Sequence, residues 1–184
     1  HALEWEDQRA TIDNNKALTR HHRDYLLKNI QWGDQANISD LNECNRRWGQ
    51  FDMIVDDGSH VNWHQIKTFS HAFIHLVKPG GVYIVEDLQT SFHKRWGGTL
   101  DNQKQHKTMV STIQDMIAAL SFHWWDHPKY NSNLEENSYK QEVAEGFVLH
   151  QEIMEWVQTI DCDREICAIR KRTTKLIKDI HKQM

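Results

Sequence analysis

Residues 51–57 read Phe-Asp-Met-Ile-Val-Asp-Asp, and residues 82–87 read Val-Tyr-Ile-Val-Glu-Asp. Each run is a short apolar stretch closed by two carboxylates, which is typical of a buried strand in a parallel sheet. Between them, apolar residues recur at helical spacing from Asn62 to Val77, and Lys-Pro-Gly-Gly at 78–81 stops that helix. A strand, a crossover helix and a strand within about 35 residues make a βαβ unit, so the two strands are predicted to be parallel neighbours.

Further elements are expected on both sides of this unit. The pattern predicts, in chain order, strands at 10–13 and 29–32, a helix capped by Ser39, a long amphipathic helix over 103–123, an antiparallel hairpin built from 155–160 and 165–170, and a basic, solvated terminal helix or tail over 171–184. Residues 1–184 are therefore predicted to form one α/β domain with a mostly parallel sheet.

Composition excludes some functions. Lys and Arg number 22 against 26 Asp and Glu, so the net charge of -4 argues against nucleic acid as a partner. No run approaches the roughly 18 apolar residues of a membrane-spanning helix and no signal sequence opens the chain, so a cytoplasmic protein without a membrane partner is expected. Hydrophobic residues make up only 39% of the chain, which suggests that core-forming sequence is missing or is contributed by a partner, such as a second copy of the chain.

The cysteines give no metal or disulfide pattern. Cys44, Cys162 and Cys167 are odd in number and lack the paired spacing of zinc ligands. All three are predicted to be thiols packed as small apolar groups.

Four carboxylates, those of Asp56, Asp57, Glu86 and Asp87, follow the two central strands. Ligands of open α/β sheets collect at the carboxyl ends of the strands, and neighbouring strands lie roughly 5 Å apart. Two like charges about 4 Å apart repel by about 4 kcal/mol at an effective dielectric near 20, and neither motif contains Lys or Arg. A cation is therefore expected, and oxygen ligands favour Mg²⁺, Mn²⁺ or Ca²⁺ over zinc. The alternative is ordinary turn chemistry, which Asp-Gly-Ser also suits.

His60 follows three residues after Asp57, within reach of anything that the metal holds. Histidine titrates near neutral pH, which suits a general base, a role worth about 10²–10⁴-fold in rate. His60 is therefore the predicted catalytic residue.

These residues also carry a family resemblance. Val-Asp-Asp-Gly-Ser-His at 55–60, with Lys-Pro-Gly-Gly-Val-Tyr-Ile-Val-Glu-Asp-Leu-Gln-Thr-Ser at 78–91, closely resembles the metal-dependent sugar O-methyltransferases of macrolide and tetracenomycin antibiotic biosynthesis. The resemblance extends more weakly to residues 33–35, to the glycines at 97 and 98, to the long helix and to the hairpin. It implies a Rossmann-like class I methyltransferase with helices on both faces of the sheet, S-adenosylmethionine and Mg²⁺ (or Mn²⁺) as cofactors, and an acceptor sugar with vicinal hydroxyls, in a small molecule or a glycan.

The resemblance also implies roles for single residues. The implied metal ligands are Asp57, Glu86 and Asp87, and the implied general base is His60. The implied cofactor contacts are Asp34 and Gln35 near the adenine, Asp13 at the ribose hydroxyls if Ile12-Asp13 ends a strand, and Asp56.

One departure concerns the cofactor loop. Class I methyltransferases carry a glycine-rich loop after their first strand, but no glycine precedes Gly33. If residues 2–5 end the first helix, the first strand and its loop are missing and the domain is N-terminally incomplete. Two other readings stay open: a non-catalytic, methyltransferase-like module that binds glycan or serves as a scaffold, and a hydrolase in which the same carboxylates hold a metal-bound water.

Overall fold

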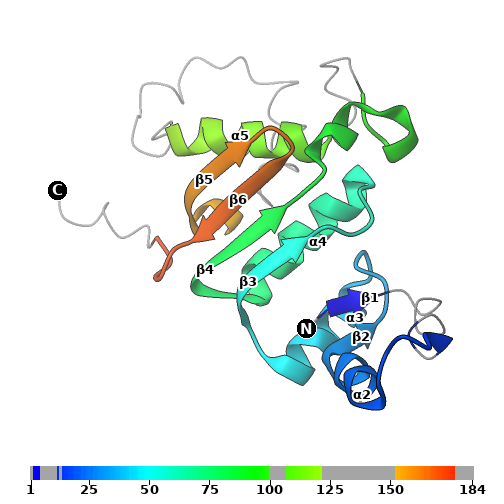
Figure 1. The fold of residues 1–184 in the computed structure, drawn as a ribbon. Helices are drawn as coiled ribbons and strands as arrows, with labels where there is room; N and C mark the ends of the chain where they lie inside the picture. The colour runs from blue at the N-terminus through cyan, green and yellow to red at the C-terminus, as the bar shows by residue number, and fades with distance from the viewer. Residues whose placement is uncertain (1, 5–11, 13, 100–106, 122–151, 177–184) are drawn as a thin grey trace, which may run out of the picture. The chain divides into compact units, whose positions relative to one another are not determined.

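The computed structural model describes residues 2–4, 12, 14–99, 107–121 and 152–176 (Figure 1). Its contacts divide the chain into two units, residues 1–50 and residues 51–184, and each is described by itself. Among the described residues, no helix is long and apolar enough to cross a membrane.

The first unit holds two short parallel strands and two helices. β1 (Ala2–Glu4) pairs with β2 (Ile30–Trp32). α2 (Arg20–Asn29) leads directly into β2, and α3 (Ile38–Trp48) follows it. The strand predicted at 29–32 is thus confirmed, with a parallel partner at the start of the chain.

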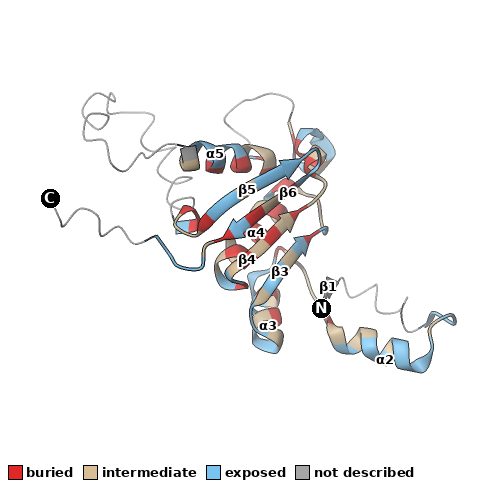
Figure 2. Cartoon of the chain, turned by 60° about the vertical axis from the view of Figure 1, so that its left-hand side comes forward, coloured by how far each residue is buried: buried red, intermediate tan, exposed pale blue. Residues whose placement is uncertain are grey.

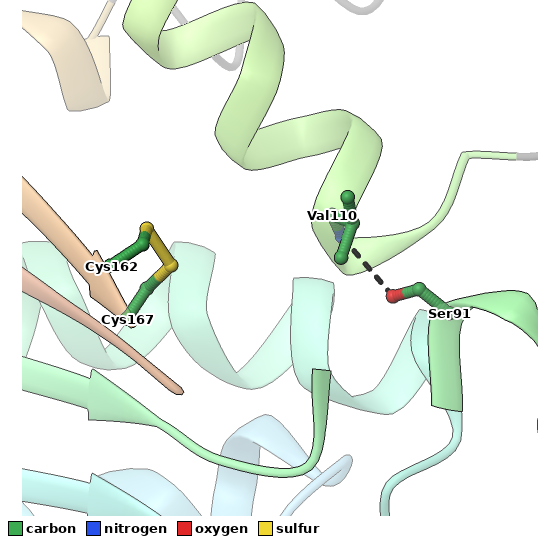
Figure 3. Close-up of a disulfide and its surroundings, with 4 residues drawn as sticks. All are labelled: Ser91, Val110, Cys162 and Cys167. Atoms are coloured by element: carbon green, nitrogen blue, oxygen red, sulfur yellow. Dashed lines mark hydrogen bonds between the residues drawn. A yellow bond between two sulfur atoms is a disulfide. The ribbon is translucent and has the colours of Figure 1, made fainter. Parts of the chain in front are cut away.

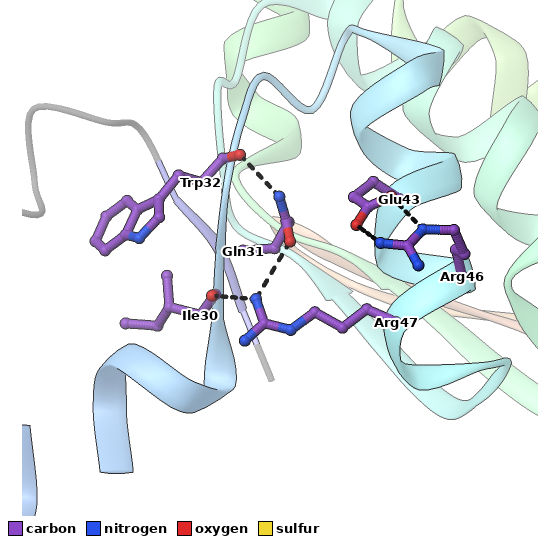
Figure 4. A network of polar contacts seen from close by, with 6 residues as sticks. All are labelled: Ile30, Gln31, Trp32, Glu43, Arg46 and Arg47. Atoms are coloured by element: carbon purple, nitrogen blue, oxygen red, sulfur yellow. Dashed lines mark hydrogen bonds and ion pairs between the residues drawn. The ribbon is translucent and has the colours of Figure 1, made fainter. Parts of the chain in front are cut away.

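The side chain of Arg47 joins these elements (Figure 4). Its guanidinium donates to the carbonyl oxygens of Lys28 at 2.8 Å and Ile30 at 3.0 Å, and to Oε1 of Gln31 at 3.3 Å. Because a planar guanidinium can donate in several directions at once, one residue near the end of α3 satisfies groups at the end of α2 and in β2. This contact holds α3 against the strand pair.

Two expectations for this unit are wrong. Residues 2–4 form β1 instead of ending a helix, since a stretch this short shows no period of its own and pairing with β2 decides its conformation. Ile12 has a helical backbone, so the predicted strand at 10–13 does not form there, and residues 10, 11 and 13 lie outside the described part of the chain.

The start of α3 also differs from the prediction. Asn37 is the N-cap, and its Oδ1 accepts a hydrogen bond from the backbone N–H of Ser39 at 3.0 Å. Asparagine caps helices as well as serine does, so Ser39 lies inside the helix instead of capping it.

The second unit is built on a four-stranded mixed sheet. Its strands, in spatial order, are β3 (Phe51–Asp56), β4 (Val77–Val85), β6 (Ile166–Lys171) and β5 (Val157–Asp163). β3 and β4 are parallel and joined by α4 (Asn62–His75), which confirms the βαβ unit, and the antiparallel β5–β6 hairpin is confirmed as well. α5 (Met109–Ser121) corresponds to the described part of the predicted long helix.

β4 begins earlier than the sequence suggests. Residues 78–81 follow the end of α4 as predicted, but they lie within β4 and not in a turn. A Cβ at Gly81 would lie 2.8 Å from the carbonyl oxygen of Asp52, so glycine is needed where β4 passes β3 most closely.

The core lies between the sheet and the helices α4 and α5 (Figure 2). Phe69 and Phe73 of α4 pack on each other, and Phe69 meets the ring of Tyr83 in β4 at a centroid distance of 5.2 Å. All three side chains are fully buried. By contrast, Met53 and Val55 of β3 are about half exposed, at 57% and 50%. The side of β3 that carries Met53 and Val55 is therefore open within the described residues.

The prediction that all three cysteines are free thiols is only partly correct. Cys162 and Cys167 stand directly opposite each other in the β5–β6 register and form a disulfide (Figure 3). An odd cysteine count excludes full pairing but leaves room for one pair, and a tight hairpin places residues five apart face to face. Cys44 is a buried free thiol, as expected, and burial raises its pKa to about 11.

The position of Lys171 contradicts the prediction that the tail is solvated from residue 171 onward. It is the last residue of β6 and is 2% exposed, and its Nζ donates to the carbonyl oxygens of Ile74 at 2.7 Å and Val77 at 2.8 Å. These carbonyls lie where α4 gives way to β4, so the lysine satisfies buried acceptors there. Residues 172–176 are not helical, and 177–184 lie outside the described part.

Burial lowers the pKa of Lys171 from 10.5 to about 8. The unfolded chain therefore holds this proton above pH 8 while the folded chain releases it, so stability should rise with pH between about 8 and 10. The neutral amine still has N–H groups for both carbonyls. Lys171→Met should lack this rise, which urea unfolding of both proteins at pH 7 and pH 9.5 would measure. Parallel pH responses of the two proteins would contradict the assignment.

Candidate metal centre

Three side chains converge at the carboxyl edge of the β3–β4 pair. Asp57, His60 and Asp87 each offer one ligand atom, and these atoms all lie within 4.8 Å of one another. Asp57 directly follows β3 and Asp87 follows β4 by two residues, so the parallel pairing of the strands brings them together. The convergence predicted for the two acidic motifs is thus seen for one carboxylate of each.

The backbone at this edge is unusual. His60 and Asp87 both have φ of 55°, in the left-handed region that residues other than glycine rarely adopt. Such a conformation costs on the order of 1–3 kcal/mol and persists only where the surroundings impose it. The carbonyl oxygen of Asp87 accepts from the N–H of Thr90 at 3.0 Å and from its hydroxyl at 2.7 Å, which holds the turn closed.

The Asp87 carboxylate is oriented by two neighbours. Its Oδ2 lies 3.2 Å from Nε2 of His60, and its Oδ1 accepts from Nε2 of Gln89 at 3.1 Å. The indole of Trp96 meets the imidazole edge-on at a centroid distance of 5.9 Å. These contacts fix the imidazole between a carboxylate and an aromatic ring.

The electrostatics of this group suit a cation. Within the described residues no Lys or Arg forms an ion pair with Asp57 or Asp87, and the His60 side chain is 23% exposed. Two carboxylate oxygens and an imidazole nitrogen within a few ångströms of each other are chemically fit to hold one divalent ion.

The other residues predicted at this edge are not members of the three-residue group. Glu86 is half-buried and does not belong to the three-residue group, although its backbone N–H donates to the carbonyl oxygen of Asp56 at 3.0 Å and ties the two strand ends together. Asp56 is buried, and its Oδ2 accepts from the hydroxyl of Tyr83 at 2.6 Å. Burial, and then the Asp56 charge, raise the pKa of Tyr83 well above its usual value. Asp56 is predicted to contact the cofactor, and in the structure its carboxylate accepts a buried hydrogen bond from Tyr83.

We expect Tyr83→Phe to destabilise the protein by about 1–3 kcal/mol, because it leaves the buried Asp56 carboxylate without this donor while keeping the ring packed. The free energy of unfolding in urea at pH 7 measures the loss. Phe73→Tyr, which adds a hydroxyl in the same core, would show whether any polar change there has the same effect. A Tyr83→Phe protein as stable as the parent would contradict the importance of the bond.

The predicted adenine contacts lie in the first unit. Asp34 is half-buried, its Oδ1 accepts from the N–H of Ala36 at 2.8 Å, and its own N–H donates to Oδ2 of Asp40 at 2.9 Å. Gln35 is also half-buried, and Asp13 lies outside the described residues. The roles of all three towards a cofactor stay predictions.

Sequence reasoning missed Asn62 and Trp96. Asn62 is the first residue of α4 and is 1% exposed, which is unusual for an amide and signals a buried hydrogen-bond network. Trp96 ends the short helix η2 (Lys94–Trp96). Its place against His60 follows from the path of the intervening loop, which no sequence period encodes.

Comparisons with known proteins find similarity to sugar O-methyltransferases. No family model matches the chain. It is 38% identical over 104 residues to the mycinamicin VI 2''-O-methyltransferase of Micromonospora griseorubida, covering 56% of the chain and 26% of that protein. It is 50% identical over 82 residues to the L-olivosyl-oleandolide 3-O-methyltransferase of Streptomyces antibioticus, covering 44% and 20%. The resemblance to sugar O-methyltransferases of antibiotic pathways is thereby confirmed.

Solved structures show the same likeness. The MycE methyltransferase of the mycinamycin pathway, in complex with Mg and SAH, matches with a TM-score of 0.62 at 26% identity over 84% of this chain and 35% of that one. Its complex with Mg, SAH and mycinamycin VI matches with a TM-score of 0.57 at 25% identity over 78% and 32%. The fold is that of the class I methyltransferases. The chain spans about a quarter of the length of the curated relatives.

Proposed function

We propose that this protein is a divalent-metal-dependent O-methyltransferase that transfers a methyl group from S-adenosylmethionine to a hydroxyl of a sugar with vicinal hydroxyls, carried by a glycosylated small molecule. The observation that carries the proposal is the convergence of Asp57, His60 and Asp87 at one strand edge of a class I methyltransferase fold. Relatives named for methylation of sugars on macrolides and tetracenomycin support the acceptor class.

Asp57 and Asp87 are the residues that would hold the metal, with Glu86 as the further ligand that the family resemblance implies. When bound, Mg²⁺ or Mn²⁺ supplies positive charge that makes a nearby sugar hydroxyl more acidic, and S-adenosylmethionine supplies the methyl group as a sulfonium. The carboxylates that would hold the ion balance part of its charge and fix its position relative to His60.

His60 is the residue that takes the hydroxyl proton. A proton held at its Nε2 faces Oδ2 of Asp87 at 3.2 Å. The atom that would take the hydroxyl proton is therefore the other ring nitrogen, Nδ1, which has no hydrogen-bond partner among the described residues. The ring of Trp96 packs against the imidazole at nearly a right angle, with the ring centroids 5.9 Å apart. His60 therefore acts as a general base in a fixed orientation.

The proposal is tested by incubating the protein with Mg²⁺, S-adenosylmethionine carrying a labelled methyl group, and a panel of glycosylated macrolides that bear one unmethylated sugar. Labelled acceptor that forms only when Mg²⁺ is present supports the assignment. Transfer that is unchanged in excess EDTA would refute the metal dependence, and cleavage of the glycosidic bond without methyl donor would point to a hydrolase.

A further inference from the structure

We propose that Asn62 is a positioning residue that clamps the segment from Leu88 to Gly98 and thereby holds Asp87 and Trp96 around His60. The inference rests on the proposed function only where it concerns the metal. The clamp itself is a property of the chain and can be measured without a cofactor.

The amide of Asn62 uses all of its hydrogen-bonding capacity. Nδ2 donates to the carbonyl oxygens of Thr90 at 3.3 Å and Trp96 at 3.1 Å. Oδ1 accepts from the hydroxyl of Ser91 at 2.9 Å and from the N–H of Met109 at 2.8 Å. One side chain thus joins the first turn of α4, the loop after β4 and the first residue of α5.

The position of these contacts along the chain gives them a role in the site. Asn62 follows His60 by two residues, and Thr90 and Ser91 closely follow Asp87. The carbonyl that it binds at Trp96 belongs to the residue whose ring meets His60. The clamp therefore connects His60 and Asp87, the residues of this site with left-handed backbones, and the indole beside them.

Ser91 extends the network to α5. Its hydroxyl donates to Asn62 and accepts from the N–H of Val110 at 3.2 Å (Figure 3). The chain then returns against Ser91 at Gly98, where an added Cβ would lie 2.4 Å from the Ser91 carbonyl oxygen. Glycine is needed for this approach, so the loop is closed on itself as well as clamped by Asn62.

Burial makes the network specific to one arrangement. A buried amide left without partners costs about 1–3 kcal/mol, so the observed loop conformation is favoured over any that breaks these bonds. The four bonds can oppose the strain of the left-handed residues at His60 and Asp87. Residues that support metal ligands in this way typically change metal affinity by 10–100-fold when replaced.

Asn62→Asp is the sharpest variant. It keeps the shape of the side chain but replaces both Nδ2 donors by an oxygen that faces two carbonyl oxygens. Thr112→Val is the matched control, because Thr112 is similarly buried and its hydroxyl donates to the carbonyl oxygen of Thr108, the residue just before α5, at 2.9 Å. Ser91→Ala is a milder change in the same network.

Two readouts separate the clamp from the proposed function. Hydrogen exchange of the metal-free protein should be at least 10-fold faster over residues 88–99 in Asn62→Asp, faster to a smaller extent in Ser91→Ala, and unchanged in Thr112→Val. Mn²⁺ affinity measured by electron paramagnetic resonance should fall about 10-fold or more in Asn62→Asp.

The outcomes are distinct. Exchange that is unchanged over 88–99, or that accelerates equally in β3, α4 and β4, would overturn the clamp. If Asn62→Asp does not fold, the same regional comparison in Ser91→Ala decides the question. A parent protein that binds no Mn²⁺ would refute the proposed metal dependence, while the exchange data would still test the clamp.

Discussion

Replacing Asp87 by asparagine is expected to lower the affinity for Mg²⁺ or Mn²⁺ by about 10²–10³-fold and to reduce methyl transfer by at least as much, since electrostatic stabilisation by a bound ion is worth several kcal/mol. Asparagine is close in shape to aspartate and tolerates the φ of 55° found at this position, so the backbone has no added reason to move. The change removes one negative charge from the three-residue group. Titration calorimetry with Mn²⁺ measures the affinity, and labelled methyl transfer measures the rate.

The matched control is Asp52→Asn. Asp52 lies on β3, is exposed, and forms an ion pair with Lys78 at 2.9 Å, a surface contact that contributes little to stability. Asp52→Asn should therefore leave the Mn²⁺ affinity and the rate of methyl transfer unchanged. Equal losses in the two variants, or an Asp87→Asn protein that binds Mn²⁺ as the parent does, would contradict the metal centre.

Glu86→Gln distinguishes the ligand set implied by the family resemblance from the group seen in the structure. If Glu86 becomes a ligand when the metal binds, this variant should lose affinity as Asp87→Asn does. If Asp57, His60 and Asp87 are the complete set of protein ligands, the affinity of Glu86→Gln for the metal should stay within a few fold of the parent.

The centre of the fold could be predicted because its signals are local. The two apolar runs closed by carboxylates, with one amphipathic helix between them, allow few topologies other than a parallel pair joined by a crossover. That pairing alone brings Asp57 and Asp87 to one edge. The acidic edge and His60 therefore followed from the sequence before any comparison with known proteins.

What could not be predicted depends on pairing across the chain. Residues 2–4 become a strand only because β2 accepts them, and Lys171 is buried only because carbonyls of Ile74 and Val77 need a donor. Charge and hydropathy assign such residues to the surface. The same limit applies to Asn62, whose four partners come from the segment 88–98 and from the start of α5.

Side-chain direction sets a second limit. The sequence places Asp56, Asp57, Glu86 and Asp87 at one edge, but neighbouring residues of an extended chain point to opposite sides. Asp56 turns towards Tyr83 in the core, and the left-handed turn at Asp87 aims its carboxylate at His60. No pattern of residue types predicts that turn, which is held by the loop that follows it.

His60→Gly is expected to reduce methyl transfer by about 10²–10⁴-fold, the range for loss of a general base. Glycine suits the φ of 55° at this position and leaves room for a small molecule beside Trp96. Added imidazole should therefore restore part of the rate if His60 acts as a base. His93→Ala is the control, because His93 is an exposed histidine in the neighbouring loop and should change nothing.

The affinity for Mn²⁺ decides between the two roles that the geometry allows His60. A base that is not a ligand predicts a large loss of rate with an affinity within a few fold of the parent, whereas a ligand predicts that both fall together and that imidazole restores both. A His60→Gly protein that transfers methyl groups at the parent rate would exclude both roles. The Nε2 to Oδ2 contact of 3.2 Å favours the base, because the carboxylate fixes the orientation of the ring and interacts favourably with the imidazolium that forms.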